Sequence, residues 1–473
     1  MPKLVSFTLT LAFLIAPLAA TAQQPPNILF IYTDDQGPWA LGCAGHPQAH
    51  TPNVDRLFQE GARFTNSFVV TPVCSPSRAS LMTSRYGSEL GITDWINPKV
   101  EPEVGLEPGI ATWPKLLSEA GYETCLVGKW HLGTQDRYHP SVHGYEVFRG
   151  FRPGGMTVAD PVLEIDGATK ECKGLTVDIH TDLAIDFLKR DRGDRPFLLS
   201  LHYRSPHAPW LPVADEDWKP YEGVDLLVPN PGFPNLDVPQ VKQKTRDYLS
   251  SVTGVDRNVG RLLKVLDELG LRDKTLVVFT SDNGYNIGHH GVYAKGNARW
   301  ITTDVKDLPK EDPRRLRSNM FDTSLKVPTG IRWPGVVEPG STIEETVSCL
   351  DWFPTLLAAA GVSCPTSATI RGRSFLPLLK GEEVGWDNDV YTEYSQHHYV
   401  QTGFRSYRTP EWKLVRDFLR QKKDELYHLA EDPEETQNLI DDPRFNDVRE
   451  QLDKKIRAKM AEVGDDPFGS ARP

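Results

Sequence analysis

Asn27-Ile28-Leu29-Phe30-Ile31-Tyr32 is a short apolar run that passes directly into Thr33-Asp34-Asp35-Gln36-Gly37. Such a run predicts a buried β-strand, because the central strands of a parallel sheet are covered on both faces. The arrangement recurs at 275–280, where Thr-Leu-Val-Val-Phe-Thr continues into Ser281-Asp282-Asn283-Gly284. Ligands of open α/β sheets collect at the carboxyl ends of the strands. We therefore expect these two polar clusters to meet at one edge of a sheet.

Between these two runs, strand-like segments alternate with helix-like segments. Further apolar strands are predicted at 124–127 and 197–203, and amphipathic helices at 52–61, 112–121 and 248–269. Thr51 and Pro52 suit the start of the first helix. Prolines crowded between Pro209 and Pro239 predict a long surface loop. The alternation predicts an α/β fold, a large and mostly parallel sheet sandwiched by helices.

The pattern changes from about Trp386. Short strand-like pieces at 412–415 and 425–429 precede a charged helix at 448–460. These pieces predict a smaller C-terminal α+β subdomain. We divide the chain into a signal peptide at 1–22, a large α/β domain at 23–385 and this subdomain at 386–473.

The N-terminus is typical of a secretory signal. Lys3 precedes a nearly continuous apolar stretch, which ends at Ala20-Thr21-Ala22, a small-x-small cleavage triplet. The alternative is an uncleaved anchor, but the stretch is short for a membrane span and contains Pro17. We predict a secreted or periplasmic protein without stable membrane insertion.

Composition excludes other classes. The 473 residues are 39% hydrophobic and 25% charged, which is an ordinary globular balance. A net charge of −11 makes nucleic acid a poor partner, since binding it needs a basic surface. Among the six cysteines, Cys349 and Cys364 are close enough in sequence to pair, but neither the disulfide connectivity nor the oligomeric state can be read from the sequence.

Cys74-Ser75-Pro76-Ser77-Arg78 carries the chemistry. The segment suits a helix start, where the helix dipole and a nearby cation both favour an anion, so Cys74 is a nucleophile candidate. The alternative for a bare Cys–Arg pair is a buried cysteine beside a surface arginine.

The wider pattern resembles the sulfatase family, within the alkaline-phosphatase-like superfamily. The resemblance runs from about Asn27 to Leu439 and rests on five motifs in the family's order, with Thr83-Ser84 standing where the family usually has Thr-Gly. The motifs are Asp34-Asp35-Gln36-Gly37, Cys74-x-Pro-x-Arg78, Gly128-Lys129-Trp130-His131-Leu132-Gly133, Ser205-Pro206-His207-Ala208-Pro209 and Ser281-Asp282-Asn283-Gly284.

The resemblance implies that a formylglycine-generating or maturase enzyme converts Cys74 to formylglycine, present as a hydrated aldehyde. One hydroxyl then attacks sulfur in line and displaces the alcohol. The second hydroxyl loses its proton, which expels sulfate and restores the aldehyde. An ordinary serine would lack this second hydroxyl.

A divalent cation is predicted beside this group. Asp34, Asp35, Asp282 and Asn283 offer only oxygen ligands, which suit a hard cation such as Ca²⁺ or Mg²⁺. The resemblance favours Ca²⁺ and adds an oxygen of modified Cys74 to the ligands. The alternative for each Asp is a turn or a capping residue.

Three cations are expected to hold the sulfate. Arg78 would link the hydrated aldehyde to the cation site, while Lys129 and Lys295 would contact the sulfate and the bridging oxygen. Lys295 matches the family's late lysine in position. Lys326 is the competing candidate.

Two histidines are candidates for acid–base chemistry. His131 would be the base for sulfate release, and His207 the general acid at the leaving oxygen together with Lys295. His202 is the rival of His207. The histidine pairs at 289–290 and 397–398 are assigned to surface loops, with sugar binding as the alternative.

Hydrolysis of a sulfate ester is therefore the predicted function, on an extracellular carbohydrate, because the segment 288–297 is similar to sulfatases that act on polysaccharides. The alternatives are an arylsulfatase or choline-sulfatase, a phosphodiester or phosphonate hydrolase of the same superfamily, and a non-catalytic binding protein. The Asp282-Asn283 turn favours sulfate over phosphate, since phospho-transferring relatives generally have Asp-His there.

Overall fold

The computed structural model describes residues 25–310, 312–420 and 423–467, so the predicted signal peptide at 1–22 lies outside the described residues. Its central feature is a ten-stranded sheet in the order β14-β2-β13-β9-β1-β8-β4-β5-β6-β7. The five middle strands of this order are β9 (Thr275–Ser281), β1 (Asn27–Thr33), β8 (Phe197–His202), β4 (Glu123–Lys129) and β5 (Val147–Phe151).

These five strands are parallel. β1 pairs with β8 on one side and with β9 on the other, and β4 joins β8 to β5. In the β1–β9 pair Thr33 lies opposite Ser281, so both strands end at the same edge. The outer strands are partly antiparallel: β13 (Thr329–Arg332) runs against β9 and β2. A mostly parallel sheet was predicted, and the structure confirms it.

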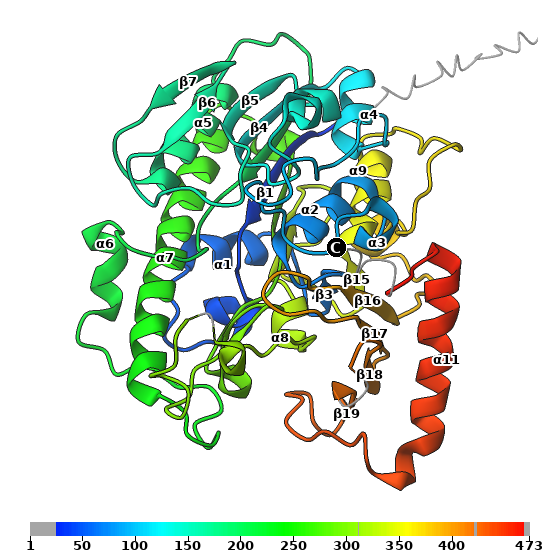
Figure 1. Ribbon diagram of the computed structural model, residues 1–473. Coiled ribbons are helices and arrows are strands. Elements are labelled where there is room, and N and C mark those ends of the chain that lie inside the picture. The colour runs from blue at the N-terminus through cyan, green and yellow to red at the C-terminus, as the bar shows by residue number, and fades with distance from the viewer. Residues whose placement is uncertain (1–24, 311, 421–422, 468–473) are drawn as a thin grey trace, which may run out of the picture.

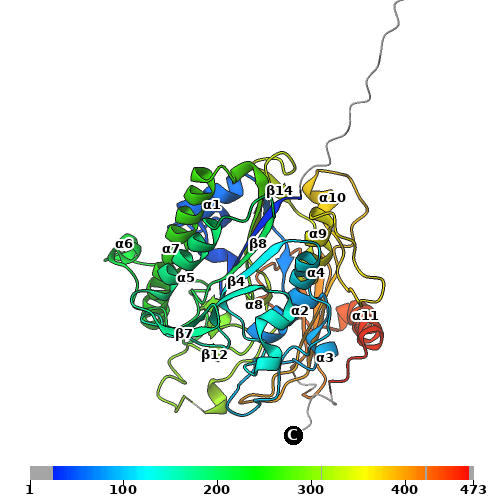
Figure 2. The same ribbon diagram turned by 90° about the horizontal axis from the view of Figure 1, so that it is seen from above.

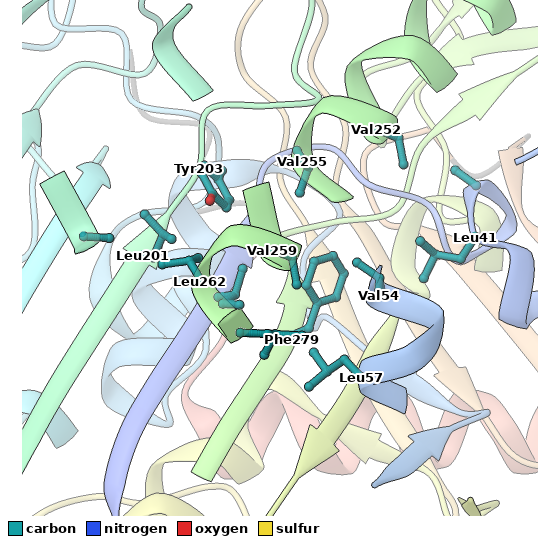
Figure 3. Close-up of a cluster of buried hydrophobic side chains, with 14 of the residues drawn as sticks. Leu41, Val54, Leu57, Leu201, Tyr203, Val252, Val255, Val259, Leu262 and Phe279 are labelled. Carbon is teal, nitrogen blue, oxygen red and sulfur yellow. The ribbon is translucent and has the colours of Figure 1, made fainter. Parts of the chain in front are cut away.

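Helices cover both faces of the sheet (Figures 1 and 2). One face packs on α1 (Pro52–Gln59), α5 (Thr176–Leu188) and α7 (Val238–Glu268). Figure 3 shows part of this layer, where Val54 of α1 and Val259 of α7 meet Phe279 of β9. Alternate strand residues point to the other face and pack on α2 (Cys74–Thr83), α4 (Trp113–Glu119) and α9 (Trp352–Ala359).

The proline-rich segment ends earlier than the sequence indicated. α7 starts at Val238, ten residues before the predicted start, and Pro239 lies in its first turn. The Asp237 side chain caps this helix by accepting from the backbone N–H of Gln240. A proline in a first turn removes an N–H that has no helical partner, so here it marks a helix start and not a loop.

The C-terminal part forms a separate four-stranded antiparallel sheet, in the order β16 (Val390–Tyr394), β17 (Phe404–Arg408), β18 (Trp412–Asp417) and β19 (Glu425–His428). Helix α11 (Asn446–Val463) packs on it through Leu452 and Ile456. The predicted smaller C-terminal α+β unit is confirmed. The pieces at 412–415 and 425–429 are β18 and β19, while β16 and β17 were not predicted.

The remaining described elements are short. They are β2 (Ala62–Phe64), β3 (Ser67–Phe68), α3 (Gly87–Leu90), β6 (Val162–Ile165), β7 (Ala168–Glu171), α6 (Asp215–Trp218), β10 (Asn286–Ile287), β11 (Val292–Ala294), β12 (Arg299–Trp300), α8 (Asp322–Leu325), β14 (Ser341–Ile343), β15 (Val347–Ser348) and α10 (Leu376–Leu379). All six cysteines are described and are free thiols, so Cys349 and Cys364 are not paired. Within the described ranges, no helix has the length and apolarity that a membrane crossing requires.

Candidate active site

The two acidic clusters meet at the carboxyl edge of the sheet. Asp34 and Asp35 follow β1, Asp282 and Asn283 follow β9, and all four are buried. The backbone N–H of Asp35 donates to Asp282 Oδ1 at 3.0 Å, across 247 residues of sequence. Carboxylate oxygens of Asp34, Asp35 and Asp282 lie within 4.8 Å of one another. Parallel pairing of β1 with β9 therefore builds an acidic cluster from two distant segments.

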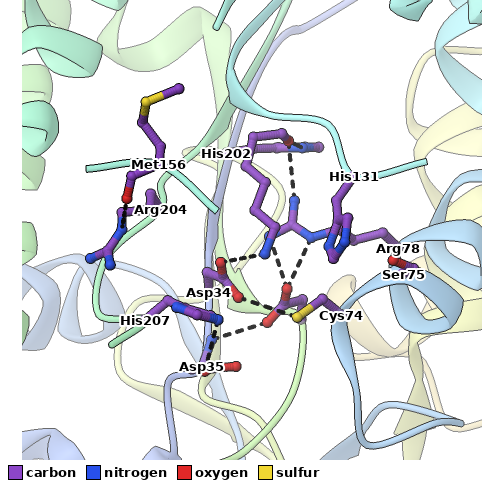
Figure 4. A network of polar contacts seen from close by, with 12 residues as sticks. Asp34, Asp35, Cys74, Ser75, Arg78, His131, Met156, His202, Arg204 and His207 are labelled. Atoms are coloured by element: carbon purple, nitrogen blue, oxygen red, sulfur yellow. Dashed lines mark hydrogen bonds and ion pairs between the residues drawn. The ribbon is translucent and has the colours of Figure 1, made fainter. Parts of the chain in front are cut away.

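Cys74 begins α2 and points into this cluster (Figure 4). Its Sγ lies 3.7 Å from Asp34 Oδ1 and 2.7 Å from Lys295 Nζ. Every residue of α2 is buried, so the backbone around Cys74 is held by packing. The candidate nucleophile and the predicted metal ligands are thus in direct contact.

Arg78 lies one helical turn after Cys74 and faces the same way. Its Nε and Nη2 both lie 2.9 Å from Asp282 Oδ2, and its Nη1 donates to the backbone oxygen of Lys129 at 3.2 Å. The guanidinium also stacks over the Tyr32 ring, 5.1 Å from its centroid. Arg78 therefore ties α2 to the ends of β9 and β4.

Two lysines pair with the acidic cluster. Lys129, the last residue of β4, is fully buried and places Nζ 2.6 Å from Asp34 Oδ2. Lys295, the residue after β11, donates to Asp35 Oδ1 and to Cys74. The competing Lys326 lies elsewhere, with Nζ over the Phe68 ring at 5.7 Å. The structure brings Lys295, and not Lys326, to Cys74.

The charges of this cluster depend on one another. Burial opposes ionisation of Asp34, but Lys129 and the other cations nearby hold the pKa of this carboxyl well below its usual range. Burial and the negative charge of Asp34 raise the pKa of Asp282. Burial also raises the pKa of the Cys74 thiol to about 11. An unmodified Cys74 is therefore protonated at neutral pH and is a poor nucleophile.

The donor set fits a hard divalent cation. The side-chain oxygen of Asn283 is buried without a hydrogen-bond partner, while its Nδ2 donates to Asp35 Oδ1 at 2.8 Å. An unpartnered oxygen beside three crowded carboxylates is an arrangement that a cation would stabilise. Asp34, Asp35, Asp282 and Asn283 together could supply the oxygen-only ligands that the sequence indicated.

His131 lies at the edge of the site. It has a left-handed backbone (φ 60°), and its Nε2 lies 3.0 Å from the backbone oxygen of Ile96. A carbonyl accepts only, so the proton belongs on Nε2 and Nδ1 is left as a buried acceptor without a partner. Burial and then the Lys129 charge hold the pKa of His131 well below its usual range. The neutral imidazole is therefore the form present at neutral pH.

His207 is partly exposed, with 30% of its side chain accessible, and its Nε2 lies 3.8 Å from Asp35 Oδ2. Its Nδ1 lies 2.6 Å from the backbone oxygen of Ala208. The rival His202 ends β8 and is buried deeper, with Nδ1 3.2 Å from the backbone oxygen of Lys129 and its ring against Tyr32. The structure therefore brings His207 to the carboxylates and leaves His202 behind Lys129.

Two residues at the site were missed from the sequence. Arg204 is buried beside Asp34 and Asp35 and donates to the backbone oxygens of Met156 and Pro209. It lies just after β8, so the strand-end rule would have flagged it. Asn319 donates to the backbone oxygen of Lys295 at 3.0 Å, and no local pattern marks this residue.

The chain belongs to the sulfatase family. The family model "Sulfatase" matches residues 26–362, and the model "N-sulphoglucosamine sulphohydrolase, C-terminal" matches 315–462. Members of this family hydrolyse sulfuric esters, and this protein is accordingly an enzyme of that class.

Named relatives cover nearly the whole chain. The N-acetylglucosamine-6-O-sulfatase of Bacteroides thetaiotaomicron is 27% identical over 90% of this chain and 85% of its own length. The ulvan-active sulfatase of Formosa agariphila is 28% identical over 93% and 82%. A solved structure in complex with its substrate D-glucosamine-2-N,6-O-disulfate superposes with a TM-score of 0.80 at 26% identity, covering 95% of this chain and all of that one.

Proposed function

We propose that this protein hydrolyses sulfate esters on an extracellular carbohydrate, with formylglycine at position 74 and a bound divalent cation, Ca²⁺ before Mg²⁺. The observation that carries the proposal is the contact of Cys74 with both Asp34 and Lys295. Sulfatase relatives named for amino sugars and for ulvan support the carbohydrate. The predicted signal at 1–22 supports secreted or periplasmic action.

The cation would be held by Asp34, Asp35, Asp282 and Asn283, with an oxygen of modified Cys74. When bound, it would supply a Lewis acid for a sulfate oxygen and a template for the reacting groups. Arg78 keeps Asp282 in place by its two contacts at 2.9 Å. Lys129 does the same for Asp34.

Formylglycine would supply the attacking hydroxyl and, through its second hydroxyl, the release of sulfate. The high pKa of the Cys74 thiol supports this modification, since the thiol itself has little nucleophilic form at neutral pH. Burial opposes the charge of Lys295, but Asp35 raises its pKa, so Lys295 retains its proton. Lys295 and Lys129 therefore offer two positive charges to a sulfate group held beside Cys74.

The two histidines divide the proton transfers. Nδ1 of His131 is a neutral, unpartnered acceptor, which suits the base that takes the proton during sulfate release. Burial lowers the pKa of His207, while Asp34 and Asp35 oppose the shift. A bound sulfate monoester adds negative charge there and favours the protonated form, so His207 can act with Lys295 as the acid at the leaving oxygen.

The test combines mass spectrometry with turnover. The peptide that contains residue 74 should be lighter than the cysteine form by the replacement of thiol with aldehyde, and the same preparation should release sulfate from sulfated sugars. A phosphodiester and choline sulfate serve as competing substrates. An intact thiol in fully active protein, or preferred cleavage of the phosphodiester, would contradict the proposal.

A further inference from the structure

A cavity lies where the sheet domain meets the C-terminal sheet. Its volume is about 470 Å³, within the range of small-molecule sites. Described residues from both parts of the chain contribute to its wall: they lie in the stretch before α8, in the loop between β16 and β17, and at positions 420 and 423 between β18 and β19. The polar or aromatic lining residues are Ser318, His397, Tyr399, Gln401, Arg420 and Lys423.

One wall of the cavity borders Lys295. Ser318 lines the cavity, and the next residue, Asn319, donates its Nδ2 to the backbone oxygen of Lys295 at 3.0 Å. The backbone N–H of Asn319 also donates to the oxygen of Gly296 at 2.9 Å. The residue that follows a lining residue of the cavity thus holds the segment that places Lys295 at Cys74.

A second part of the wall, next to the first, borders His131: Ser318 Oγ donates to the side-chain oxygen of Gln396, the residue before His397. His397 lines the cavity, and the Nε2 of its neighbour His398 lies 3.0 Å from the backbone oxygen of Trp95. The next carbonyl, that of Ile96, contacts Nε2 of His131. Both parts of the wall are therefore joined, through neighbouring residues, to the segments that place Lys295 and His131 in the candidate active site.

The charge of the cavity is opposite to that of the protein. The chain carries a net −11, yet none of the described lining residues is an aspartate or a glutamate. The side chains of Arg420 and Lys423 have no hydrogen-bond or ion-pair partner among the described residues, whereas nearby Arg317 is paired with Glu425. Burial, then Arg317 and Arg420, lower the pKa of Lys423. Asp417 and Glu425 oppose this shift but do not line the cavity, so two cations without a direct ion-pair partner among the described residues face it.

Tyr399 supplies an aromatic surface at this cavity. It is 63% exposed although it is large and apolar, and its backbone is left-handed (φ 66°). Trp95 stacks near it at 6.3 Å between centroids, and the Arg299 guanidinium lies 5.6 Å from its ring. An exposed ring held by neighbours is a surface on which the apolar face of a sugar can stack.

We propose that this cavity binds a second, anionic sugar residue of the substrate, next to the residue whose sulfate ester is cleaved. Arg420 and Lys423 pair with its sulfate or carboxylate group, and Tyr399 supports its ring. This proposal rests on the proposed function. It makes the substrate class a polyanionic oligosaccharide or polysaccharide and not an isolated sulfated monosaccharide.

Binding can be measured without turnover in the full-length Cys74→Ala chain. Isothermal titration calorimetry would compare glucosamine 6-sulfate with three hexasaccharides: one from chondroitin 6-sulfate (sulfate and carboxylate), one from carrageenan (sulfate only) and one from unsulfated chondroitin (carboxylate only). We expect at least one hexasaccharide to bind 10-fold or more tightly than the monosaccharide. The best-bound hexasaccharide identifies the anion that the cavity accepts.

The double variant Arg420→Ala/Lys423→Ala should lose about 10-fold or more in affinity for that hexasaccharide and little for the monosaccharide. Lys380→Ala, which removes an exposed charge elsewhere, is the matched control. The proposal is overturned if no hexasaccharide binds more tightly than the monosaccharide, or if the double variant loses no more than the control. Turnover of sulfated sugars by the unaltered protein tests the proposed function separately.

Discussion

Two buried ionic networks in this molecule differ in whether their polar atoms all have hydrogen-bond partners. In the first, Lys413 donates to the oxygen of Met320 and to the carboxylates of Asp322 and Glu435, at 2.6 to 2.8 Å. Arg408 adds a contact to Asp322 at 2.9 Å. All three ammonium hydrogens of Lys413 have acceptors, and two cations balance two carboxylates.

The second network, at the ends of β1 and β9, is incomplete. Asn283 Oδ1, His131 Nδ1 and His202 Nε2 are buried without partners. A raised carboxyl pKa does not separate the two networks, because burial and a neighbouring carboxylate raise it for Asp282 here and for Glu435 in the first network. A buried polar group without a partner costs free energy, so an incomplete network needs a ligand or a reaction to explain it. Completeness of the hydrogen bonds separates the network around Lys413 from the one around Cys74, which is the candidate active site.

The largest effect should come from Cys74→Ser. The hydroxyl is close in size to the thiol, so the free energy of unfolding should change little, but serine cannot provide the second hydroxyl that releases sulfate. We expect kcat to fall by about 10³-fold or more. Rapid-quench kinetics should show at most one equivalent of alcohol released per enzyme. Sustained multiple turnover by Cys74→Ser would contradict the proposal that sulfate release needs a second hydroxyl at residue 74.

Next in size is Lys413→Met in the complete network. It leaves Asp322 and Glu435 buried without their shared cation, which costs about 3–5 kcal/mol in the free energy of unfolding. Chemical denaturation measures this loss, and Lys455→Met, at an exposed pair with Asp389, is the control. A loss under about 1 kcal/mol would mean that the network is not structural.

Metal addition should then distinguish the two networks. A cation that binds only the folded chain stabilises it, by about 2.7 kcal/mol at a concentration 100 times its Kd. We expect Ca²⁺ to raise the Tm and EDTA to reverse the rise. In Asp282→Asn the rise in Tm with Ca²⁺ should be much smaller. Asp322→Asn should be less stable than the unaltered chain, but its Tm should still rise with Ca²⁺. An equal Ca²⁺ response in the two variants would place the ion elsewhere.

The smallest effect concerns the cluster of Glu101 and His397 near the cavity. Burial opposes ionisation of Glu101, but hydrogen bonds from His397 and His398 lower its pKa to about 2, and Glu101 in turn raises the pKa of His397. The Glu101 contribution to stability is present above its unfolded pKa, near 4.5, and is lost as the pH falls towards 2.

The His397 contribution has the opposite sign. It is complete below the unfolded pKa of 6.5 and is lost as the pH rises through the higher folded value. Titration of the His397 ring by NMR should therefore give a pKa above 6.5, which returns towards 6.5 in Glu101→Gln. Gln135→Glu, which adds a charge outside this cluster, should leave the titration unchanged. Equal values in the unaltered chain and Glu101→Gln would contradict the assignment.

The fold and the acidic cluster could be predicted from local sequence patterns. The apolar runs at β1 and β9 are long enough to identify as buried strands, and the parallel rule then joins Asp34 to Asp282. The boundary of α7 was misjudged because Pro239 has the same local signal in a loop and in a first helical turn. β16 and β17 carry polar and charged residues at buried positions, among them Glu393 and Arg405, so their apolar pattern was weak.

The choice between Lys295 and Lys326 needed tertiary structure. Lys295 follows Val-Tyr-Ala and Lys326 follows Thr-Ser-Leu, and neither local sequence shows that the pairing of β10 with β11 brings Lys295 back to Cys74. Asn319 acts through a backbone oxygen, which no sequence motif can mark. Contacts to the backbone from residues far away in sequence are the part of this site that a motif search does not reach.

The bond from Lys295 to Cys74 spans 221 residues. A ribosome that adds about 5–20 residues per second needs roughly 10–45 s to travel from one to the other. Lys295 has not been synthesised until the end of that interval, and β9 (Thr275–Ser281) is made only in its last part, so residue 74 cannot be enclosed earlier as it is in the finished protein. The order of synthesis thus leaves the thiol of residue 74 exposed in the nascent chain before folding closes over it.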